Sequence, residues 1–382
     1  MSQNLELRPA SEAERIHALD ALRGMAILGV LLAYTVWNLG APPSETWNAA
    51  DRAATTLMDF LVDNKFLTTF AFLFGVGISQ QWKRWEAAGP NAAPLHLRRM
   101  GFLFAVGILH GILLRNGDIL APYAILGIIL LGFRRLSNRT IATAAVILFF
   151  LPYFFRWLVP ALGLSWPSRP GAVAGGYFAE NFAWLRYWYM TNPFLSWPQV
   201  AALMLAGVLT GRAGLIERAA ESRSLARRIL VFAFPLAVVT RAAHVALYML
   251  WANQVPGLAK GATLNFLFQA SSWTLAAAYA AGLLLISQGT KLLGPLRAIG
   301  RMAFTNYLLQ ALLVVPFCLA FGLFDRISPF RGFLLAVAVA ALQAAFSTWW
   351  LGRYSMGPLE RLWRGVTYGF GRVSMQKTAP AP

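Results

Sequence analysis

The residues that could carry chemistry in this sequence are a few polar side chains that lie inside long apolar runs. A polar or ionisable side chain in the middle of a membrane span is costly, so it usually has a functional role or a specific partner. His110, Arg241 and His244 lie in such runs. An imidazole can act as a general base or as a nucleophile, and a guanidinium can hold an anion or an oxyanion. These side chains indicate either group transfer or anion binding inside a membrane.

His110 has a candidate partner in Asp118, which follows it in the same stretch of sequence. The separation is about 12 Å along a straight helix, which is too far for a contact within one helix. Asp118 can orient His110 only if the chain reverses at Asn116 and Gly117, and the composition there favours a turn. Asp118 also suits the N-cap of the next helix, and the two roles are compatible. A buried histidine with a structural role only is the alternative.

Arg241 and His244 form the second candidate pair. They are three residues apart and therefore share a face of one helix. Arg241 lies roughly 20 Å along that helix from its start. The pair is either an inward-facing group satisfied by carbonyls and other helices, or a site for an anion or a thioester.

Two amides and two glycines complete the set of unusual residues in the apolar runs. Asn306 and Gln310 are four residues apart, which suits either hydrogen bonds between helices or contacts to a ligand. Gly75 and Gly77 favour close packing of helices. The four His and the scattered carboxylates show no spacing typical of metal ligands, and no phosphate-binding loop is present. We therefore expect no metal site.

The elements that must position these residues are membrane-spanning helices. The chain has 382 residues, of which 58% are hydrophobic and only 13% are charged, whereas soluble domains are about 25% charged. Its apolar runs are close to the roughly 20 residues that cross a bilayer. We therefore predict an all-α, polytopic transmembrane bundle of about ten spans. The predicted spans are 24–40, 64–81, 98–116, 119–133, 139–161, 196–211, 228–252, 264–287, 303–324 and 332–351.

The distribution of positive charge predicts the topology of this bundle. The formal net charge is +18, but the basic residues lie in the connections rather than on one soluble face, so nucleic acid is not an expected partner. Most of the 33 Lys and Arg residues fall on the side that holds the N-terminus. The positive-inside rule then places both termini in the cytoplasm of a bacterial-type inner membrane. Residues 1–23 and 352–382 are the predicted cytoplasmic arm and tail, and 24–351 is the transmembrane domain.

The longest predicted external segment, residues 162–195, is rich in aromatic side chains. Phe178, Phe182, Leu185 and Tyr189 follow the spacing of one helical stripe. Two interpretations remain open for this segment. It is either an aromatic belt at the membrane interface or a lid over an external substrate pocket.

Four stretches of the sequence resemble the YeiB-like family of bacterial membrane proteins. The first, Leu19 to Gly24, is similar to the family's Leu-Asp-x-Leu-Arg-Gly opening. The others are Lys65-Phe66 with Phe70 to Gly77; Leu109-His110-Gly111, Gly117 to Leu120 and Tyr123; and Gly300 to Ala303, Thr305 to Tyr307, Gln310, Gly357 to Glu360 and Trp363. These stretches span most of the chain.

The resemblance implies a relation to the transmembrane acyltransferases. A protein of that kind would move an acyl group, such as acetyl, from cytoplasmic acyl-CoA to a hydroxyl or amine acceptor in or across the membrane. One acyltransferase group has a His eleven residues after the Arg of its opening motif, and that position is Tyr34 here. His110 is therefore the expected reactive imidazole, with Asp118, Arg241 and His244 as the residues that orient it or stabilise the oxyanion.

The expected donor, acyl-CoA, is a substrate rather than a tightly bound cofactor. Guanidinium groups match phosphate geometry, so arginines near the predicted cytoplasmic mouth could hold its nucleotide phosphates. The candidate donor contacts are Arg23, Lys65, Arg98, Arg99, Arg301, Asn306 and Gln310. Anchoring at lipid head groups is the alternative role for the arginines. The rival functions are a transporter or flippase for an anionic or lipid-linked solute, and a quinone- or lipid-binding membrane protein; membrane lipids are expected partners, and a homo-oligomer is compatible with the sequence.

Overall fold

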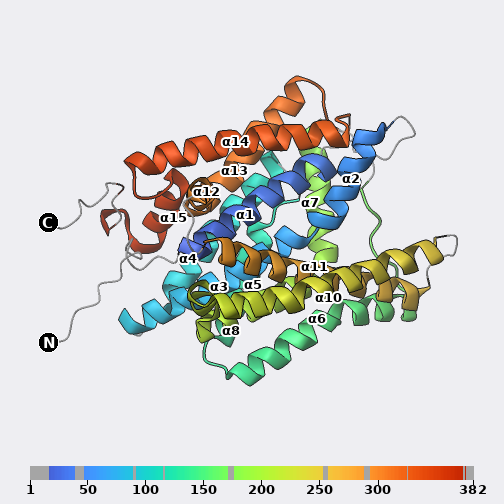
Figure 1. The fold of residues 1–382 in the computed structure, drawn as a ribbon, viewed down its shortest axis with the longest axis horizontal. Helices are drawn as coiled ribbons and strands as arrows, with labels where there is room; N and C mark the ends of the chain where they lie inside the picture. Colours follow the sequence, from blue (N-terminus) through green and yellow to red (C-terminus); the bar gives the residue numbers. More distant parts are fainter. Residues whose placement is uncertain are drawn as a thin grey trace. The chain divides into compact units, whose positions relative to one another are not determined.

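The protein is helical throughout the part of the chain that its computed structural model describes (Figure 1). The described residues are 17–38, 47–88, 92–114, 117–170, 176–252, 257–287, 293–324, 326–372 and 375. Most of the predicted N-terminal arm and the end of the predicted tail lie outside them. The helices are α1 (His17–Ala33), α2 (Ala49–Leu61), α3 (Lys65–Ala88), α4 (Ala92–Leu113), α5 (Leu120–Leu130), α6 (Asn138–Ala161), α7 (Gly176–Leu195), α8 (Trp197–Ala213), α9 (Leu215–Glu221), α10 (Arg223–Leu250), α11 (Leu258–Ser287), α12 (Gly294–Arg301), α13 (Ala303–Ala320), α14 (Pro329–Arg353) and α15 (Pro358–Tyr368).

Each of the ten predicted spans overlaps one of these helices. By length and composition, seven helical segments of the described chain can cross a membrane, and the bent pair α7–α8, with 62° between its halves, brings the number to eight. The segment from residue 120 to 133 is a shorter apolar helix. The all-α membrane fold is therefore confirmed, while ten spans remains a prediction.

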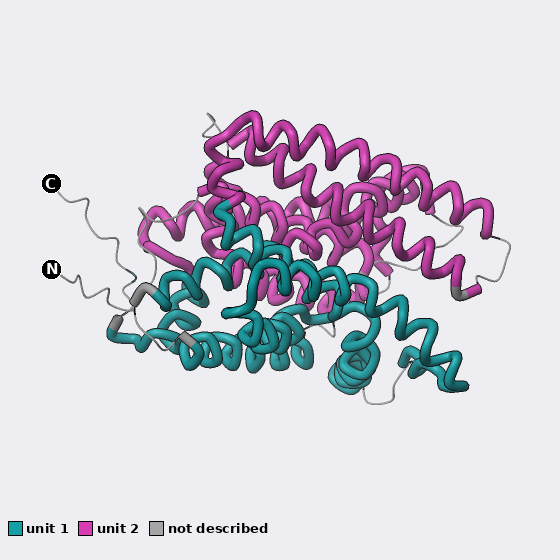
Figure 2. Tube along the Cα trace, turned by 90° about the horizontal axis from the view of Figure 1, so that it is seen from below, with its two compact units in different colours: residues 1–15, 71–214, 358–375 teal, residues 16–70, 215–357, 376–382 magenta. Residues whose placement is uncertain are grey.

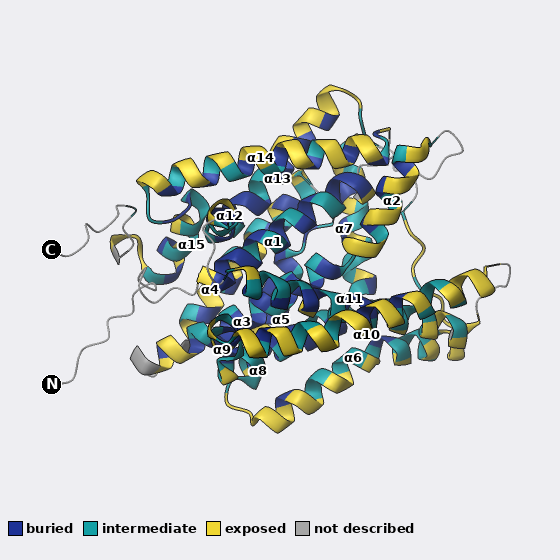
Figure 3. Cartoon of the chain, in the orientation of Figure 1, coloured by how far each residue is buried: buried dark blue, intermediate teal, exposed yellow. Residues whose placement is uncertain are grey.

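Several helices have exposed residues along one side (Figure 3), and many of these residues are apolar, as expected for contact with lipid. On α6, Val146 is 59% exposed, and on α10, Phe232 is 76% exposed and Val239 is 63% exposed. A water-soluble protein rarely leaves such apolar faces open to solvent. A helix satisfies its own backbone hydrogen bonds, so it can present such a face to hydrocarbon.

The chain divides into two compact units (Figure 2). Among the described residues, unit 1 comprises 71–214 and 358–375, and unit 2 comprises 17–70 and 215–357. Within unit 1, α4 packs against α5, α6 packs against α8, and α15 packs against α4. Within unit 2, α10 and α11 lie side by side, and α1 packs against α12 and α14.

The close approach of α1 and α12 depends on two glycines. A Cβ on Gly24 would collide with the carbonyl of Leu296, and a Cβ on Gly300 would collide with the carbonyl of Asp20. Neither position therefore accepts a larger side chain without movement of the backbone. Both glycines belong to the stretches that carry the family resemblance.

Five helices lie wholly outside the ten predicted spans. These are α2, α7, α9, α12 and α15. The start of α2 has a capping box in which Asn48 and Asp51 bond each other's backbone N–H groups. In addition, α1 begins at His17, inside the predicted arm, and α15 lies inside the predicted tail.

Candidate functional site

The structure brings His110 and Asp118 together inside unit 1. His110 lies in the last turn of α4, and Asp118 lies directly before α5. His110 Nδ1 is 3.0 Å from Asp118 Oδ1, and the two side chains are only 2% and 1% exposed. The chain reverses between them, as the sequence predicted; Asn116 lies outside the described residues. A carboxylate at Nδ1 holds the imidazole so that Nε2 is the nitrogen that can take a proton.

The N-cap position of α5 is Ile119 and not Asp118 as the sequence predicted, but the Asp118 side chain, one residue earlier, still bonds the first turn of the helix. Its Oδ2 accepts a hydrogen bond of 2.9 Å from the backbone N–H of Ala121 in the first turn of α5. One carboxylate therefore caps a helix with one oxygen and contacts the imidazole with the other. The cap fixes the direction of the carboxylate towards His110.

Gly107, one turn before His110, provides the room for this contact. A Cβ at that position would come within 2.6 Å of Asp118 Oδ2 and would also collide with the backbone N of Ala121. Contacts under 3.0 Å require something to shift. The glycine therefore lets α5 and its capping carboxylate approach α4 closely.

Helix α7 packs beside this pair and contributes its aromatic side chains. Tyr177 donates a 2.7 Å hydrogen bond to the carbonyl of Leu114, and Asn181 donates a 3.2 Å hydrogen bond to the carbonyl of Ile112. These bonds satisfy carbonyls at the end of α4, which have no partner within the helix. Further along α7, the phenol of Tyr189 interacts electrostatically with Asp118.

The predicted aromatic stripe of α7 does not form a single buried face. Phe178 and Phe182 are exposed, whereas Leu185 is buried and Tyr189 is partly buried. All four positions fall within about 60° of one another round an ideal helix with 3.6 residues per turn, so the burial changes along the length of α7 and not round its axis. The inward part of α7 is thus its C-terminal half, next to Asp118.

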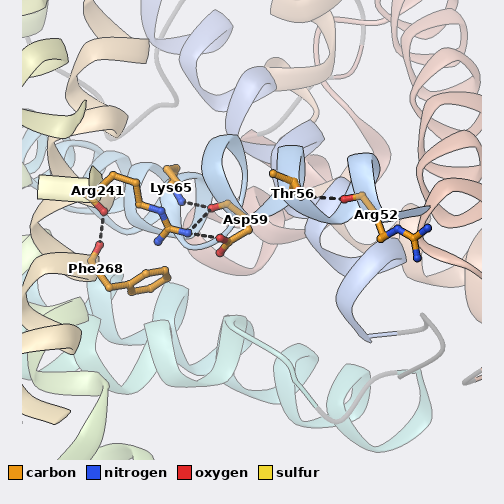
Figure 4. Close-up of polar contacts among 7 residues, drawn as sticks. Arg52, Thr56, Asp59, Lys65, Arg241 and Phe268 are labelled. Carbon is orange, nitrogen blue, oxygen red and sulfur yellow. Dashed lines mark hydrogen bonds and ion pairs between the residues drawn. The ribbon is translucent and has the colours of Figure 1, made fainter. Parts of the chain in front are cut away.

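A second group of charged residues lies within unit 2, around Arg241 (Figure 4). Arg241 forms an ion pair with the carboxylate of Asp59, which is in the last turn of α2. The Arg241 side chain is 8% exposed, and the Asp59 side chain is 40% exposed. Sequence reasoning placed Arg241 correctly in an inward position but did not identify Asp59.

Lys65 and His244 belong to the same group. Lys65 is 1% exposed and donates a 2.7 Å hydrogen bond to the main-chain oxygen of Asp59. The ring of Phe268, on α11, lies 5.6 Å from Lys65 Nζ and 5.5 Å from Arg241 Cζ. The His244 ring contacts the same phenylalanine, at 5.7 Å between centroids. Arg241 and His244 therefore share a helix face, as predicted, and that face lies against Phe268.

Three of the four predicted donor arginines have local partners in the described structure. In unit 2, Arg23 pairs with Asp20 at 3.2 Å, and Arg301 donates to the carbonyl of Ser355 at 3.1 Å. In unit 1, Arg99 Cζ lies 3.7 Å from the ring centre of Trp363, and Arg98 is exposed. These contacts are compatible with a structural role, and binding of donor phosphates by these arginines remains a prediction.

Asn306 and Gln310 are buried in unit 2, where Asn306 takes part in a polar seam between α13 and α14. Asn306 Nδ2 donates to Ser347 Oγ at 2.9 Å and to the carbonyl of Ile299 at 3.1 Å. Gln343 Nε2 donates to the carbonyl of Asn306 at 2.7 Å. This geometry matches hydrogen bonds between helices. Ligand contact by either amide remains a prediction.

Metal-ligating side chains do not gather in the described part of the chain. No group of three or more His, Cys, Asp or Glu residues there could hold a metal ion.

Comparison with known proteins places the chain among bacterial relatives. Residues 210–370 match a family described as a protein of unknown function, DUF418. The uncharacterised protein YxaH of Bacillus subtilis is 29% identical, over 95% of this chain and 96% of its own length. An uncharacterised 39.9 kDa protein from the amylase 3′ region of Bacillus acidopullulyticus is 28% identical, over 94% and 96%. The uncharacterised protein YeiB of Escherichia coli is 27% identical, over 96% of this chain and 100% of its own length. These similarities confirm the predicted resemblance of the chain to the YeiB-like family.

Proposed function

We propose that this protein is a membrane-embedded acyltransferase. It moves an acyl group from cytoplasmic acyl-CoA to a hydroxyl or amine acceptor in or across the membrane. The observation that carries the proposal is the buried contact between His110 Nδ1 and Asp118 Oδ1, at 3.0 Å. A buried imidazole beside a carboxylate suits general-base catalysis of acyl transfer.

In this proposal, His110 Nε2 removes the proton from the acceptor as the acceptor oxygen or nitrogen attacks the thioester carbonyl. The carbon–sulfur bond then breaks, and CoA leaves as a thiolate that takes the proton from the imidazolium. Asp118 stabilises the imidazolium through Nδ1. A general base of this kind contributes a factor of about 10²–10⁴ to the rate.

Basic and amide side chains are the candidate contacts of the donor. Arg98 and Arg99 are the candidates in unit 1, and Arg23, Lys65, Arg301, Asn306 and Gln310 are those in unit 2. We place the protein in a bacterial inner membrane with both termini in the cytoplasm, because most of its basic residues fall on that side. Acyl-CoA, the acceptor and membrane lipids are its proposed partners.

The test uses the full-length protein, purified in detergent. Acyl-CoAs of different chain length should raise its thermal midpoint, because a ligand that binds the folded state stabilises it. A panel of hydroxyl and amine acceptors should then give acceptor-dependent release of CoA. The variant His110→Gln should bind acyl-CoA and lose acyl transfer.

A matched control is His17→Gln, because His17 is exposed at the start of α1. Its rate should equal that of the natural protein. A folded His110→Gln protein with undiminished transfer would contradict the proposal. Saturable flux of an anionic solute without release of CoA would favour the transporter instead.

A further inference from the structure

We propose that Lys65 and Arg241 form a binding site for a small oxyanion, a carboxylate or a phosphate group, and that Asp59 is the counter-ion which the ligand displaces. The site lies wholly within unit 2 and uses neither His110 nor Asp118. It shares Lys65 with the proposed donor contacts, but its test uses probes that contain no acyl-CoA and is therefore independent of acyl transfer.

Lys65 and Arg241 have more hydrogen-bond donors than the described structure satisfies. Arg241 Nη2 contacts Asp59, but Nε and Nη1 are buried and have no hydrogen-bond partner among the described residues. Lys65 Nζ has three donors, and the one hydrogen bond that it makes in the described structure goes to the Asp59 main-chain oxygen. Unsatisfied buried donors are unfavourable, and a ligand with several acceptor oxygens would satisfy them.

Aromatic rings lie close to the Arg241 guanidinium. The rings of Phe60 and Phe268 lie 4.9 and 5.5 Å from Arg241 Cζ. Aromatic rings attract cations, but they offer no hydrogen-bond acceptors to an in-plane N–H group. The low polarity around the cations makes an added negative charge more favourable there than at an exposed arginine.

Two cations and two carboxylates lie close enough in this group to act on one another. Lys65 and Arg241 repel each other, and the carboxylates of Asp59 and Asp63 act on both of them. His244 also faces this group and interacts with Arg241. An additional anion would therefore compete with a carboxylate for the cations. Of the two carboxylates, Asp59 is the one that a ligand must displace, because Asp59 forms the ion pair with Arg241.

A ligand could reach Lys65 and Arg241 if the Asp59 side chain moved aside. The Asp59 side chain is 40% exposed and Phe60 is 39% exposed, whereas Lys65 and Arg241 are buried behind them. Figure 4 shows Asp59 between the two cations and the rest of α2. A carboxylate that reaches the surface can swing away and expose the cations. In the absence of a ligand it keeps Arg241 from being buried without a partner, which would be strongly unfavourable.

The experiment measures the thermal midpoint of the detergent-purified, full-length protein with three probes. The probes are sodium acetate, sodium phosphate and dihexanoyl phosphatidic acid, with sodium chloride at equal ionic strength as the reference. The variants are Asp59→Asn, Arg241→Gln and Lys65→Gln. Arg52→Gln is the matched control, because Arg52 is an exposed arginine on the same helix, α2.

We expect at least one probe to stabilise the natural protein and the Arg52→Gln control equally. The Asp59→Asn protein should bind that probe about tenfold more tightly, which corresponds to about 1.4 kcal/mol, because the competing carboxylate is gone. Arg241→Gln and Lys65→Gln should lose the effect. Stabilisation by acetate or phosphate identifies a soluble anion as the ligand, and stabilisation by the short-chain lipid alone identifies a lipid headgroup.

Two results would overturn the proposal. One is that no probe stabilises either the natural protein or the Asp59→Asn protein. The other is that the Asp59→Asn protein binds the probe no more tightly than the natural protein does, and this comparison holds even if Arg241→Gln or Lys65→Gln does not fold. The His110→Gln protein should keep the anion effect in full, so failure of acyl transfer and failure of the anion site are distinguishable.

Discussion

His110 and Asp118 face each other across the reversal between α4 and α5, with Nδ1 and Oδ1 3.0 Å apart. The second oxygen of the same carboxylate caps α5 through the N–H of Ala121. The position of the proposed base thus depends on a helix cap. Substitutions of Asp118 can separate the structural role from the chemical one.

Asp118→Asn should keep the protein stable and impair acyl transfer. Asparagine is as good an N-cap as aspartate, so the thermal midpoint should change little. The amide cannot stabilise an imidazolium, so the rate of CoA release should fall by a large part of the factor of about 10²–10⁴ that a general base contributes. Asp118→Ala should also lose the cap and about 0.5–2 kcal/mol of stability. An Asp118→Asn protein with the natural rate would exclude the proposed role of the carboxylate.

Gly107→Ala should disrupt the site although it replaces neither His110 nor Asp118. The added methyl group would lie 2.6 Å from Asp118 Oδ2, so α5 must shift or the cap must break. Overpacking of this kind costs about 1–3 kcal/mol. Unfolding and CoA-release assays should both show the defect. Gly101→Ala, on the same helix with nothing within 4 Å of the new methyl group, is the control and should be neutral in both.

The membrane helices could be predicted well because the pattern that identifies each of them lies within one short stretch of sequence. Each span is a continuous apolar run, and its backbone can be satisfied only by a helix in lipid. The reversal before Asp118 was also predictable, because Gly117 and a capping carboxylate follow directly after an apolar run. Helices α2 and α15 were missed as helices because each is amphipathic and carries charges, as a loop does.

The partner of Arg241 could not be predicted, because Asp59 is 182 residues away in the chain. No spacing rule connects two residues on helices so far apart in sequence. The cost of a charged side chain inside a membrane span indicated only that Arg241 needs a partner. Only the contact between the end of α2 and α10, where Asp59 meets Arg241, identifies the carboxylate. The capping box of Asn48 and Asp51 was the local signal that could have revealed α2.

Asn306 and Ser347 should show energetic coupling across the seam between α13 and α14. Their side chains form a 2.9 Å hydrogen bond and are both fully buried. Hydrogen bonds between membrane helices average about 0.6 kcal/mol and reach about 1.7 kcal/mol. A double-mutant cycle of Asn306→Ala and Ser347→Ala, measured by unfolding in mixed detergent, should give a coupling energy in that range. Additive effects of the two substitutions would show that the bond contributes nothing to stability.

Arg212 should stabilise unit 1 more than any exposed arginine near it. Its guanidinium donates to the carbonyls of Phe133 at 3.3 Å, Arg134 at 2.6 Å and Leu136 at 2.8 Å, and to Asn138 Oδ1 at 3.0 Å. It thereby joins the end of α8 to the turn that precedes α6, and it satisfies carbonyls that have no partner within a helix.

Arg212→Gln should therefore lower the stability by about 1.5–3 kcal/mol, the range for hydrogen bonds to charged groups. Arg212→Lys should recover only part of this loss, because an ammonium group cannot reproduce a planar set of donors. Arg139→Gln is the matched control, since Arg139 is an exposed residue in the first turn of α6. Unfolding in detergent should show no change for it. Equal stability of the Arg212→Gln and Arg139→Gln proteins would mean that the four hydrogen bonds are exchanged for water without loss.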